Sequence, residues 1–462
     1  MDASIETPIP DPLEVGAGTA LLVRGRCGLR EARRPRLELA GNAVTVGAWG
    51  MPEPGRLGAG ELFWAVLPIA AETPSGPQEL RLTAEVGGRE ESAVLAAIEI
   101  AGGAQLVPSP SPAAGGEEAL IAICMATHEP EPDMLRAQID SIRTQSRPNW
   151  VCVISDDASS ATARAEIERL VGGDDRFRVS AFAERLGFYR NFERALRMAP
   201  PEAELIAIAD QDDVWNPDKL EVLERRLGEL PRAGLVYSDM RLVDESRRLI
   251  SETSWVLRRN CWTDMGSLLV ANTVTGAASL MRRDLLASAL PFPPVSGEAF
   301  HDHWLALCAL ASGEIGYLDE ATYDHIRHRD SFTVREGFGI TRPVGGMPHW
   351  RLRLTGALGR LRRRALRPGW RSLYFDRYLL AVQYAVTLRL RFGAAMDAGR
   401  SRPLRRVETA ERTLSGPAWL AVRSLRPYLG RNETFARERV LLGAVLWRRL
   451  AGAMTRLRRS RV

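Results

Sequence analysis

Short apolar runs alternate with amphipathic segments between residues 117 and 335, and this alternation limits the possible folds more than any other feature of the chain. We expect strands at Ala119–Ala126, Trp150–Ser155, Phe177–Phe182, Leu205–Ala209 and Leu235–Tyr237. We expect helices near Asp133–Gln145, Ala161–Val171, Tyr189–Met198 and Pro217–Glu229. Such alternation predicts an α/β fold, in which helices cover both faces of a parallel sheet. Ligands of these sheets bind beyond the carboxyl ends of the strands, so the loops that follow the strands are the places to look for a site.

The rest of the chain differs in character from this segment. The whole chain has 462 residues, which is too long for one ordinary core. Residues 1–101 contain short β-rich runs punctuated by Gly and Pro, which favours a small β-sandwich-like domain. Residues 102–116 have the composition of a linker, residues 117–335 form the α/β domain, and residues 336–462 have an Arg-rich helical pattern.

Three carboxylates in four residues form the strongest local signal. The sequence Asp210-Gln211-Asp212-Asp213 directly follows the expected strand Leu205–Ala209. Carboxylates this close repel one another unless a cation neutralises them. Their hard oxygen ligands suit Mg²⁺ or Mn²⁺, and such sites commonly also hold substrate phosphates. The alternative is a solvated acidic loop, but Asp218 already serves the first turn of the next helix.

Two further loops follow expected strands and carry polar side chains. Asp157 follows Trp150–Ser155 and could accept a hydrogen bond from a nucleobase, although a purely capping role for this loop is an open alternative. Thr127, His128 and Glu129 would face the same crevice from the end of the first strand. As an isolated signal this second loop is weak.

Two more motifs lie further along the chain. Gly187 permits close backbone approach, and Arg190 stands at a helix start, where a cation needs an anionic partner such as a diphosphate or a surface carboxylate. Asp302 opens an apolar helix within His301-Asp302-His303-Trp304. It is either a helix cap or a general base beside an aromatic wall.

The order of these motifs resembles glycosyltransferase family 2, which has the GT-A fold, and above all its bacterial rhamnosyltransferase-like members. The likeness covers about residues 117–335. It rests on Thr127-His128-Glu129-Pro130, on the Ser155-Asp156-Asp157 end of the second strand, on Gly187, Arg190 and Asn191, on Asp210 and Asp212 as a DxD motif, on Trp215 to Lys219, on Asp302, and on Tyr323 to His328. The fold implied is that of a nucleotide-diphospho-sugar transferase, with a Rossmann-like mixed sheet.

The resemblance implies inverting, metal-dependent transfer of a sugar such as rhamnose from a nucleotide diphosphate to a hydroxyl of a glycan or a lipid-linked glycan. Asp302 would be the catalytic base, and a divalent metal, Mg²⁺ or Mn²⁺, would bind Asp210, Asp212 and His328. Donor-binding residues would be Thr127, His128, Glu129, Asp157, Gly187, Arg190, Asp210 and Gln211. Acceptor-side residues would be Gly276, His303 and Trp304. His325 could be either a site residue or a surface residue.

Two other functions compete with this interpretation. A sugar nucleotidylyltransferase normally has a Gly-rich phosphate loop after the first strand, whereas this chain has Ala126-Thr127-His128-Glu129-Pro130. A catalytically inactive scaffold or carbohydrate-binding protein is the second alternative. The simultaneous presence of Asp157, Asp210, Asp212 and Asp302 argues against it.

The charge distribution points to a partner of the carboxyl-terminal region. After residue 340 there are 28 arginines and six acidic residues, although the whole chain carries a net charge of only +5. A basic helical region predicts either peripheral contact with an anionic membrane or a solvated bundle that packs on the protein, and no motif indicates nucleic-acid binding. The five cysteines and the amino terminus, which does not resemble a secretory signal, indicate a cytoplasmic protein, peripheral at most on the inner face of the cytoplasmic membrane.

Overall fold

The computed structural model describes residues 1–29, 32–52, 60–102, 119–294, 297, 299–327 and 372–459. These residues fall into two compact units. The first unit contains the described residues within 1–105, 293–299 and 349–462, and the second contains those within 106–292 and 300–348. The amino-terminal strands and the carboxyl-terminal helices, which are far apart in the sequence, therefore belong to one unit. Of the expected linker 102–116, only residue 102 is among the described residues.

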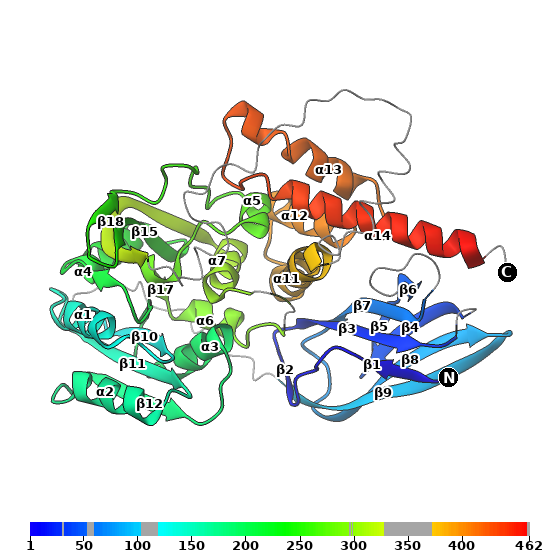
Figure 1. The fold of residues 1–462 in the computed structure, drawn as a ribbon, viewed down its shortest axis with the longest axis horizontal. Helices are drawn as coiled ribbons and strands as arrows, with labels where there is room; N and C mark the ends of the chain where they lie inside the picture. Colours follow the sequence, from blue (N-terminus) through cyan, green and yellow to red (C-terminus); the bar gives the residue numbers. More distant parts are fainter. Residues whose placement is uncertain are drawn as a thin grey trace. The chain divides into compact units, whose positions relative to one another are not determined.

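The first unit contains two β-sheets that face each other across an apolar core (Figure 1). One sheet has the order β1-β3-β7-β6, with bounds Ala3–Ile5, Thr19–Cys27, Leu62–Ile69 and Ala48–Met51. The other has the order β2-β9-β8-β4-β5, with bounds Leu13–Gly16, Arg89–Gly102, Gly76–Val86, Arg33–Leu39 and Asn42–Thr45. Buried and less buried positions alternate along part of β8, as expected for a strand with only one face on the core.

The first unit also contains helices from the end of the chain. They are η2 (Tyr374–Tyr378), α11 (Leu379–Phe392), α12 (Ala398–Glu408), α13 (Ser415–Arg423), η3 (Arg426–Leu429) and α14 (Glu438–Arg459). Helix α11 lies against β3 and β7. The indole Nε1 of Trp64 on β7 donates a hydrogen bond of 2.9 Å to the hydroxyl of Tyr374. No helix in the described part of the chain is long and apolar enough to cross a membrane.

The second unit is built on a nine-stranded sheet whose main path has the order β12-β11-β10-β13-β17-β15-β18-β14. The bounds in that order are Phe177–Phe182, Trp150–Asp157, Ile121–Thr127, Leu205–Ala209, Ser279–Arg282, Ala233–Asp244, Glu314–Arg327 and Val214–Trp215, and the short β16 (Leu249–Ser251) pairs with β15. The four strands from β12 to β13 are parallel, whereas β17 runs antiparallel to both of its neighbours. The sheet is thus mixed.

The helices of this unit begin in different ways, and only some of them have a side-chain cap. They are α1 (Pro132–Arg143), α2 (Ala161–Val171), α3 (Phe188–Met198), α4 (Lys219–Gly228), α5 (Met265–Val270), η1 (Gly276–Ala278), α6 (Asp284–Ala289) and α7 (His301–Ser312). The Glu131 carboxylate accepts a hydrogen bond from the Met134 N–H at the start of α1, and the Ser160 hydroxyl caps α2 in the same way. Helix α3 begins after Gly187, whose φ of +78° favours glycine.

Candidate active site

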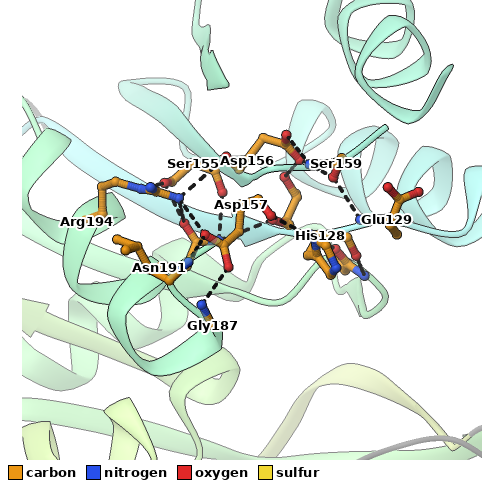
Figure 2. A network of polar contacts seen from close by, with 12 residues as sticks. His128, Glu129, Ser155, Asp156, Asp157, Ser159, Gly187, Asn191 and Arg194 are labelled. Carbon is orange, nitrogen blue, oxygen red and sulfur yellow. Dashed lines mark hydrogen bonds and ion pairs between the residues drawn. The ribbon is translucent and has the colours of Figure 1, made fainter. Parts of the chain in front are cut away.

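The loops after β10, β11 and β13 are joined by hydrogen bonds at the carboxyl edge of the parallel strands (Figure 2). His128 Nδ1 lies 2.8 Å from the carbonyl oxygen of Asp157, and the His128 N–H donates to the side chain of Gln211 at 2.9 Å. The Glu129 N–H donates to the Ser159 hydroxyl at 2.8 Å. The structure therefore brings together residues from three separate loops, as the predicted crevice requires.

Asp157 anchors the loop that leads into α3. Its two carboxylate oxygens accept hydrogen bonds of 2.8 Å from the N–H groups of Leu186 and Gly187. One of them also accepts a bond of 3.0 Å from Arg194 Nη2, whose guanidinium stacks 3.7 Å from the ring of Phe182. Arg194 is a residue that the sequence analysis missed, because its position inside α3 resembles any surface arginine. In this structure the Asp157 carboxylate holds the loop that carries Gly187.

We predict that Asp157→Asn destabilises the protein by about 2–4 kcal/mol, because it removes a buried charge that Arg194 and two backbone N–H groups share. Urea unfolding followed by tryptophan fluorescence measures this change. The control is Asp175→Asn, since Asp175 lies in an exposed turn of the same unit. Equal unfolding free energies for the two variants would contradict an anchoring role.

Thr127 and Asp156 form a buried polar layer below this network. The Thr127 hydroxyl donates to Asp156 Oδ1 at 3.2 Å, and the Ser159 hydroxyl donates to the same oxygen at 2.5 Å. Asn191 on α3 donates to the carbonyl oxygens of Thr127 and Ser155 at 3.2 and 3.0 Å. These bonds fix the ends of β10 and β11, so that the loops above them hold one position.

Arg190 has partners inside the protein. Its guanidinium pairs with Glu193 one turn along α3 and donates to the carbonyl oxygen of Phe292 at 2.9 Å. Glu193 in turn accepts hydrogen bonds of 2.9 Å from Arg197 and from the Phe292 N–H. In this structure the anionic partner of Arg190 is therefore a carboxylate of the protein, that of Glu193. A contact between Arg190 and a diphosphate stays a prediction.

The acidic segment 210–213 lies directly after β13. Burial raises the pKa of Asp210 well above its usual range, and the negative charges of Asp213, Asp212 and Asp302 raise it further. The pKa of Asp213 is also raised by burial, against which the neighbouring His325 acts. Burial and the neighbouring carboxylates thus disfavour the charged form of Asp210, and a divalent cation bound there would favour it.

Two basic side chains, His325 and Lys219, lie close to this acidic segment. His325 Nδ1 is 2.9 Å from Asp213 Oδ1. Burial lowers the pKa of His325, but the charge and hydrogen bond of Asp213, with the charges of Asp212 and Asp210, outweigh burial and raise it to about 9. Lys219 is fully buried, lies over the ring of Trp215 at 3.7 Å and donates to the carbonyl oxygen of Ala277. Burial lowers the pKa of Lys219 to about 7, although Asp213 and Asp210 act in the opposite direction.

Strand pairing explains why His325 reaches this position. Val214 pairs with Asp324 and Trp215 pairs with Tyr323 between the antiparallel strands β14 and β18. The sequence analysis left open whether His325 belongs to the site or to the surface, and the structure places it beside Asp213. His328 lies outside the described residues. Within the described part of the chain, no three His, Cys, Asp or Glu side chains are arranged to hold a metal ion by themselves.

The carboxylates present nevertheless suit a divalent ion that is shared with a phosphate ligand. Asp210 and Asp212 offer hard oxygen ligands, which Mg²⁺ and Mn²⁺ prefer. Mg²⁺ is commonly held by one or two carboxylates together with water and substrate phosphates. The raised pKa of Asp210 is the observation that favours a cation here.

Asp302 opens α7 and lies against η1. Burial raises its pKa to about 7, while hydrogen bonds from the N–H groups of His303 and Gly276 and from Asn272 lower it. Its charge contributes to the raised pKa of Asp210, so Asp302 is electrically coupled to the acidic segment. A pKa near 7 suits a general base that works at neutral pH.

The residues around Asp302 explain why position 276 is glycine. A Cβ on Gly276 would lie 2.6 Å from His301 Nε2 and 3.3 Å from the Cβ of Asp302. His301 is buried, stacks on Phe192 at 3.6 Å, and has no hydrogen-bond partner for either ring nitrogen among the described residues. Burial lowers the pKa of His301 to about 3, so its ring is neutral at physiological pH.

The other two residues predicted on the acceptor side have partners inside the second unit. His303 Nε2 lies 2.7 Å from the carbonyl oxygen of Leu268. Trp304 is fully buried, and its indole N–H donates to the carbonyl oxygen of Ala289 at 2.9 Å. The indole of Trp304 therefore belongs to the core in this structure, and the expected aromatic wall beside Asp302 is not formed by it.

The chain also resembles known proteins. Residues 122–287 match the family model "Glycosyl transferase family 2". This segment is similar to glycosyl transferase family 2 domains. The GT-A fold predicted from the sequence is confirmed, with its mixed sheet, the β-rich amino-terminal region and the helices of the carboxyl-terminal region. Asp302 and His325 lie beyond the matched residues.

Two curated relatives match parts of the chain. An uncharacterised protein, y4gI, of Sinorhizobium fredii is 30% identical over 122 residues, which are 26% of this chain and 13% of the relative. The putative teichuronic acid biosynthesis glycosyltransferase TuaG of Bacillus subtilis is 32% identical over 89 residues, 19% of this chain and 34% of TuaG. The chain thus spans about a third or less of the length of these relatives.

Two solved structures also resemble the chain. TarS of S. aureus, residues 1–349 in complex with UDP-GlcNAc, has a TM-score of 0.43 and 14% identity over 70% of this chain and 90% of that chain. The mannosyltransferase PcManGT of Pyrobaculum calidifontis, in complex with GDP-Man and Mn²⁺, has a TM-score of 0.37 and 16% identity over 73% of this chain and 89% of that chain.

Proposed function

We propose that this protein is a metal-dependent, inverting glycosyltransferase that transfers a sugar from a nucleotide diphosphate to a hydroxyl group. One observation carries the proposal: Asp210 and Asp212 directly follow β13, and burial together with the charges of Asp213, Asp212 and Asp302 raises the pKa of Asp210 well above its usual range. Carboxylates that repel one another destabilise the folded state. A divalent cation would neutralise that repulsion and would also bind the phosphates of the donor.

In this proposal each group has one task. The loops that carry Thr127, His128 and Glu129, with Gln211 and Gly187, bind the nucleotide, and the anchored Asp157 shapes their crevice. A divalent ion on Asp210 and Asp212 would neutralise charge that develops on the departing diphosphate. Asp302 takes the proton from the acceptor hydroxyl while the oxygen attacks the anomeric carbon. Attack from the side opposite the leaving group inverts the configuration at that carbon.

The proposals for the donor sugar and for the acceptor rest on similarity to other proteins rather than on the residues of the site. The resemblance to rhamnosyltransferase-like members makes a dTDP-linked deoxyhexose such as rhamnose the first donor to test. The partial similarity to TuaG supports a role in assembling a cell-surface polysaccharide or glycolipid, with a glycan or lipid-linked glycan as acceptor. We propose that the protein works at the inner face of the cytoplasmic membrane, where such acceptors are built.

A thermal-shift screen tests the proposed donor site. Purified protein is heated with UDP, dTDP, GDP or CDP, each with and without Mn²⁺ or Mg²⁺. A ligand that binds only the folded state raises the melting temperature. We expect one diphosphate to stabilise the protein, and to do so only when the metal is present. Stabilisation by none of the four nucleotides would contradict a donor site and favour an inactive scaffold protein.

A further inference from the structure

Helix α13 and the turn η3 present an apolar face to solvent. The exposed fractions are 78% for Leu414, 69% for Val422, 56% for Leu425 and 78% for Leu429. With the exposed Ala418 they recur every three or four residues, so they form one continuous line, which we call the apolar stripe. A helix at the surface of a globular protein normally turns polar residues outward, and this one does the opposite.

The inner face of the same helix explains why the apolar stripe cannot easily turn inward. Leu420 is fully buried, and Arg423 is buried as well. Arg423 Nε pairs at 3.3 Å with Glu438 at the start of α14, and Glu438 is itself fully buried. Breaking a buried ion pair by rotating one partner away is strongly unfavourable. The orientation of α13 is therefore fixed with its apolar side outward.

The surroundings of the apolar stripe carry an excess of positive charge. Residues 398–450 contain twelve arginines and four glutamates. Each of the four glutamates is paired with an arginine of the same unit, in the pairs Glu408–Arg389, Glu411–Arg448, Glu433–Arg426 and Glu438–Arg423. Exposed Arg412 and Arg431 stand just beyond the two ends of the apolar stripe.

A tyrosine completes this surface. Tyr428 is 65% exposed and follows Leu425 by three residues, next to Leu429. The guanidinium of Arg439 lies 5.2 Å from the centre of its ring. Tyrosine and arginine are residues that sit well at the boundary between lipid headgroups and acyl chains.

We propose that the apolar stripe, with Tyr428 and the arginines beside it, docks on the surface of an anionic lipid membrane. An interfacial helix buries its apolar face at the headgroup boundary, and its cationic residues approach the lipid phosphates. Such a contact is a peripheral one, because an interfacial helix lies in the plane of the membrane surface.

A second copy of this chain fits the same surface less well. A two-fold symmetric contact places one patch against an identical patch. Here that contact would bring the surplus arginines of both copies together, whereas an anionic lipid surface supplies the opposite charge. The docking surface lies wholly in the first unit, and it does not depend on the transfer reaction proposed for the second.

The test uses the full chain and co-sedimentation with vesicles. Vesicles of phosphatidylcholine with about one third phosphatidylglycerol are compared with pure phosphatidylcholine. We expect binding to the anionic vesicles that weakens with salt. The double variant Leu425→Glu, Leu429→Glu should lose at least about tenfold in apparent affinity, since it puts two carboxylates where acyl chains would lie.

A matched control separates this surface from a general effect of added charge. Leu249 and Ile250 of the second unit are 52% and 45% exposed, and Leu249→Glu, Ile250→Glu should bind vesicles as the natural chain does. If circular dichroism shows that the Leu425→Glu, Leu429→Glu variant does not fold, the milder variant Leu425→Ser, Leu429→Ser takes its place. Three results would overturn the proposal. The natural chain does not bind anionic vesicles, or the Leu425→Glu, Leu429→Glu variant binds them as tightly as the Leu249→Glu, Ile250→Glu control. The third is that the apolar stripe only mediates dimerisation, measured by size-exclusion chromatography.

Discussion

Asp302→Asn is expected to lower the rate of sugar transfer by about 10²–10⁴-fold, which is the usual range for loss of a general base. The amide keeps the shape of the side chain and can still accept hydrogen bonds from the N–H groups of His303 and Gly276. It cannot take a proton from the acceptor hydroxyl. Binding of the nucleoside diphosphate, measured by calorimetry, should change by no more than about twofold, because Asp302 acts on the acceptor rather than on the donor.

The pH dependence provides a second readout of the same residue. A general base works only when deprotonated, and burial raises the pKa of Asp302 to about 7. The kcat/KM of the natural chain should therefore be level above pH 7 and fall about tenfold for each pH unit below it. Asp319→Asn, which changes an exposed carboxylate on β18, should leave both rate and profile unchanged. Normal turnover by Asp302→Asn, or weakened diphosphate binding with a normal rate, would exclude this assignment.

Replacing both Asp210 and Asp212 by Asn should abolish the metal-dependent part of diphosphate binding, with a loss of at least about 100-fold in affinity. The same variant should melt at a higher temperature than the natural chain when metal is absent. The reason is the crowded charge, since burial and the neighbouring carboxylates raise the pKa of Asp210 well above its usual range. Removing two of these carboxylates relieves the repulsion that a cation would otherwise neutralise.

Differential scanning fluorimetry, with and without Mn²⁺ and with and without the nucleoside diphosphate, measures both effects in one experiment. Asp218→Asn is the control, because Asp218 is exposed and its side chain makes no capping hydrogen bond at the start of α4. A double variant that still shows the Mn²⁺-dependent shift would place the metal elsewhere. A lower melting temperature without metal would mean that these carboxylates support the fold.

Much of the second unit was predictable from local patterns. The expected strands at Phe177–Phe182 and Leu205–Ala209 agree with β12 and β13 residue for residue, because both are short runs bounded by clear turn and helix signals. The position of the acidic segment after β13 follows directly from that strand. The alternation of strands and helices by itself indicated a parallel sheet, whereas the mixed sheet implied by the family resemblance is the one observed, since β17 runs antiparallel between β13 and β15.

Some strands were missed because their sequences do not show a clear alternation of apolar and polar residues. Strand β18 contains Asp319, Glu320 and Asp324 among its 14 residues, and only some of its positions are buried. Strand β17 has four residues, all buried, and is too short to show alternation. In the first unit β9 begins with Arg89, Glu90 and Glu91, which resemble a loop.

The site contacts that were missed depend on pairing between distant parts of the chain. His325 meets Asp213 because β14 and β18 pair across more than 100 residues of sequence. Arg194 meets Asp157 because α3 packs against β11. Neither contact follows from a local motif, and each required the tertiary structure.

Release of nucleoside diphosphate from the donor is the measurement that tests the central claim most directly. The purified chain is incubated with dTDP-rhamnose, UDP-GlcNAc or GDP-mannose in the presence of Mn²⁺ and a bacterial glycolipid extract, beside Asp302→Asn. The account predicts acceptor-dependent release from one class of donor by the natural chain, and its loss in the variant. Equal release by both proteins, or binding of a diphosphate without any release, would contradict a transferase in which Asp302 is the base.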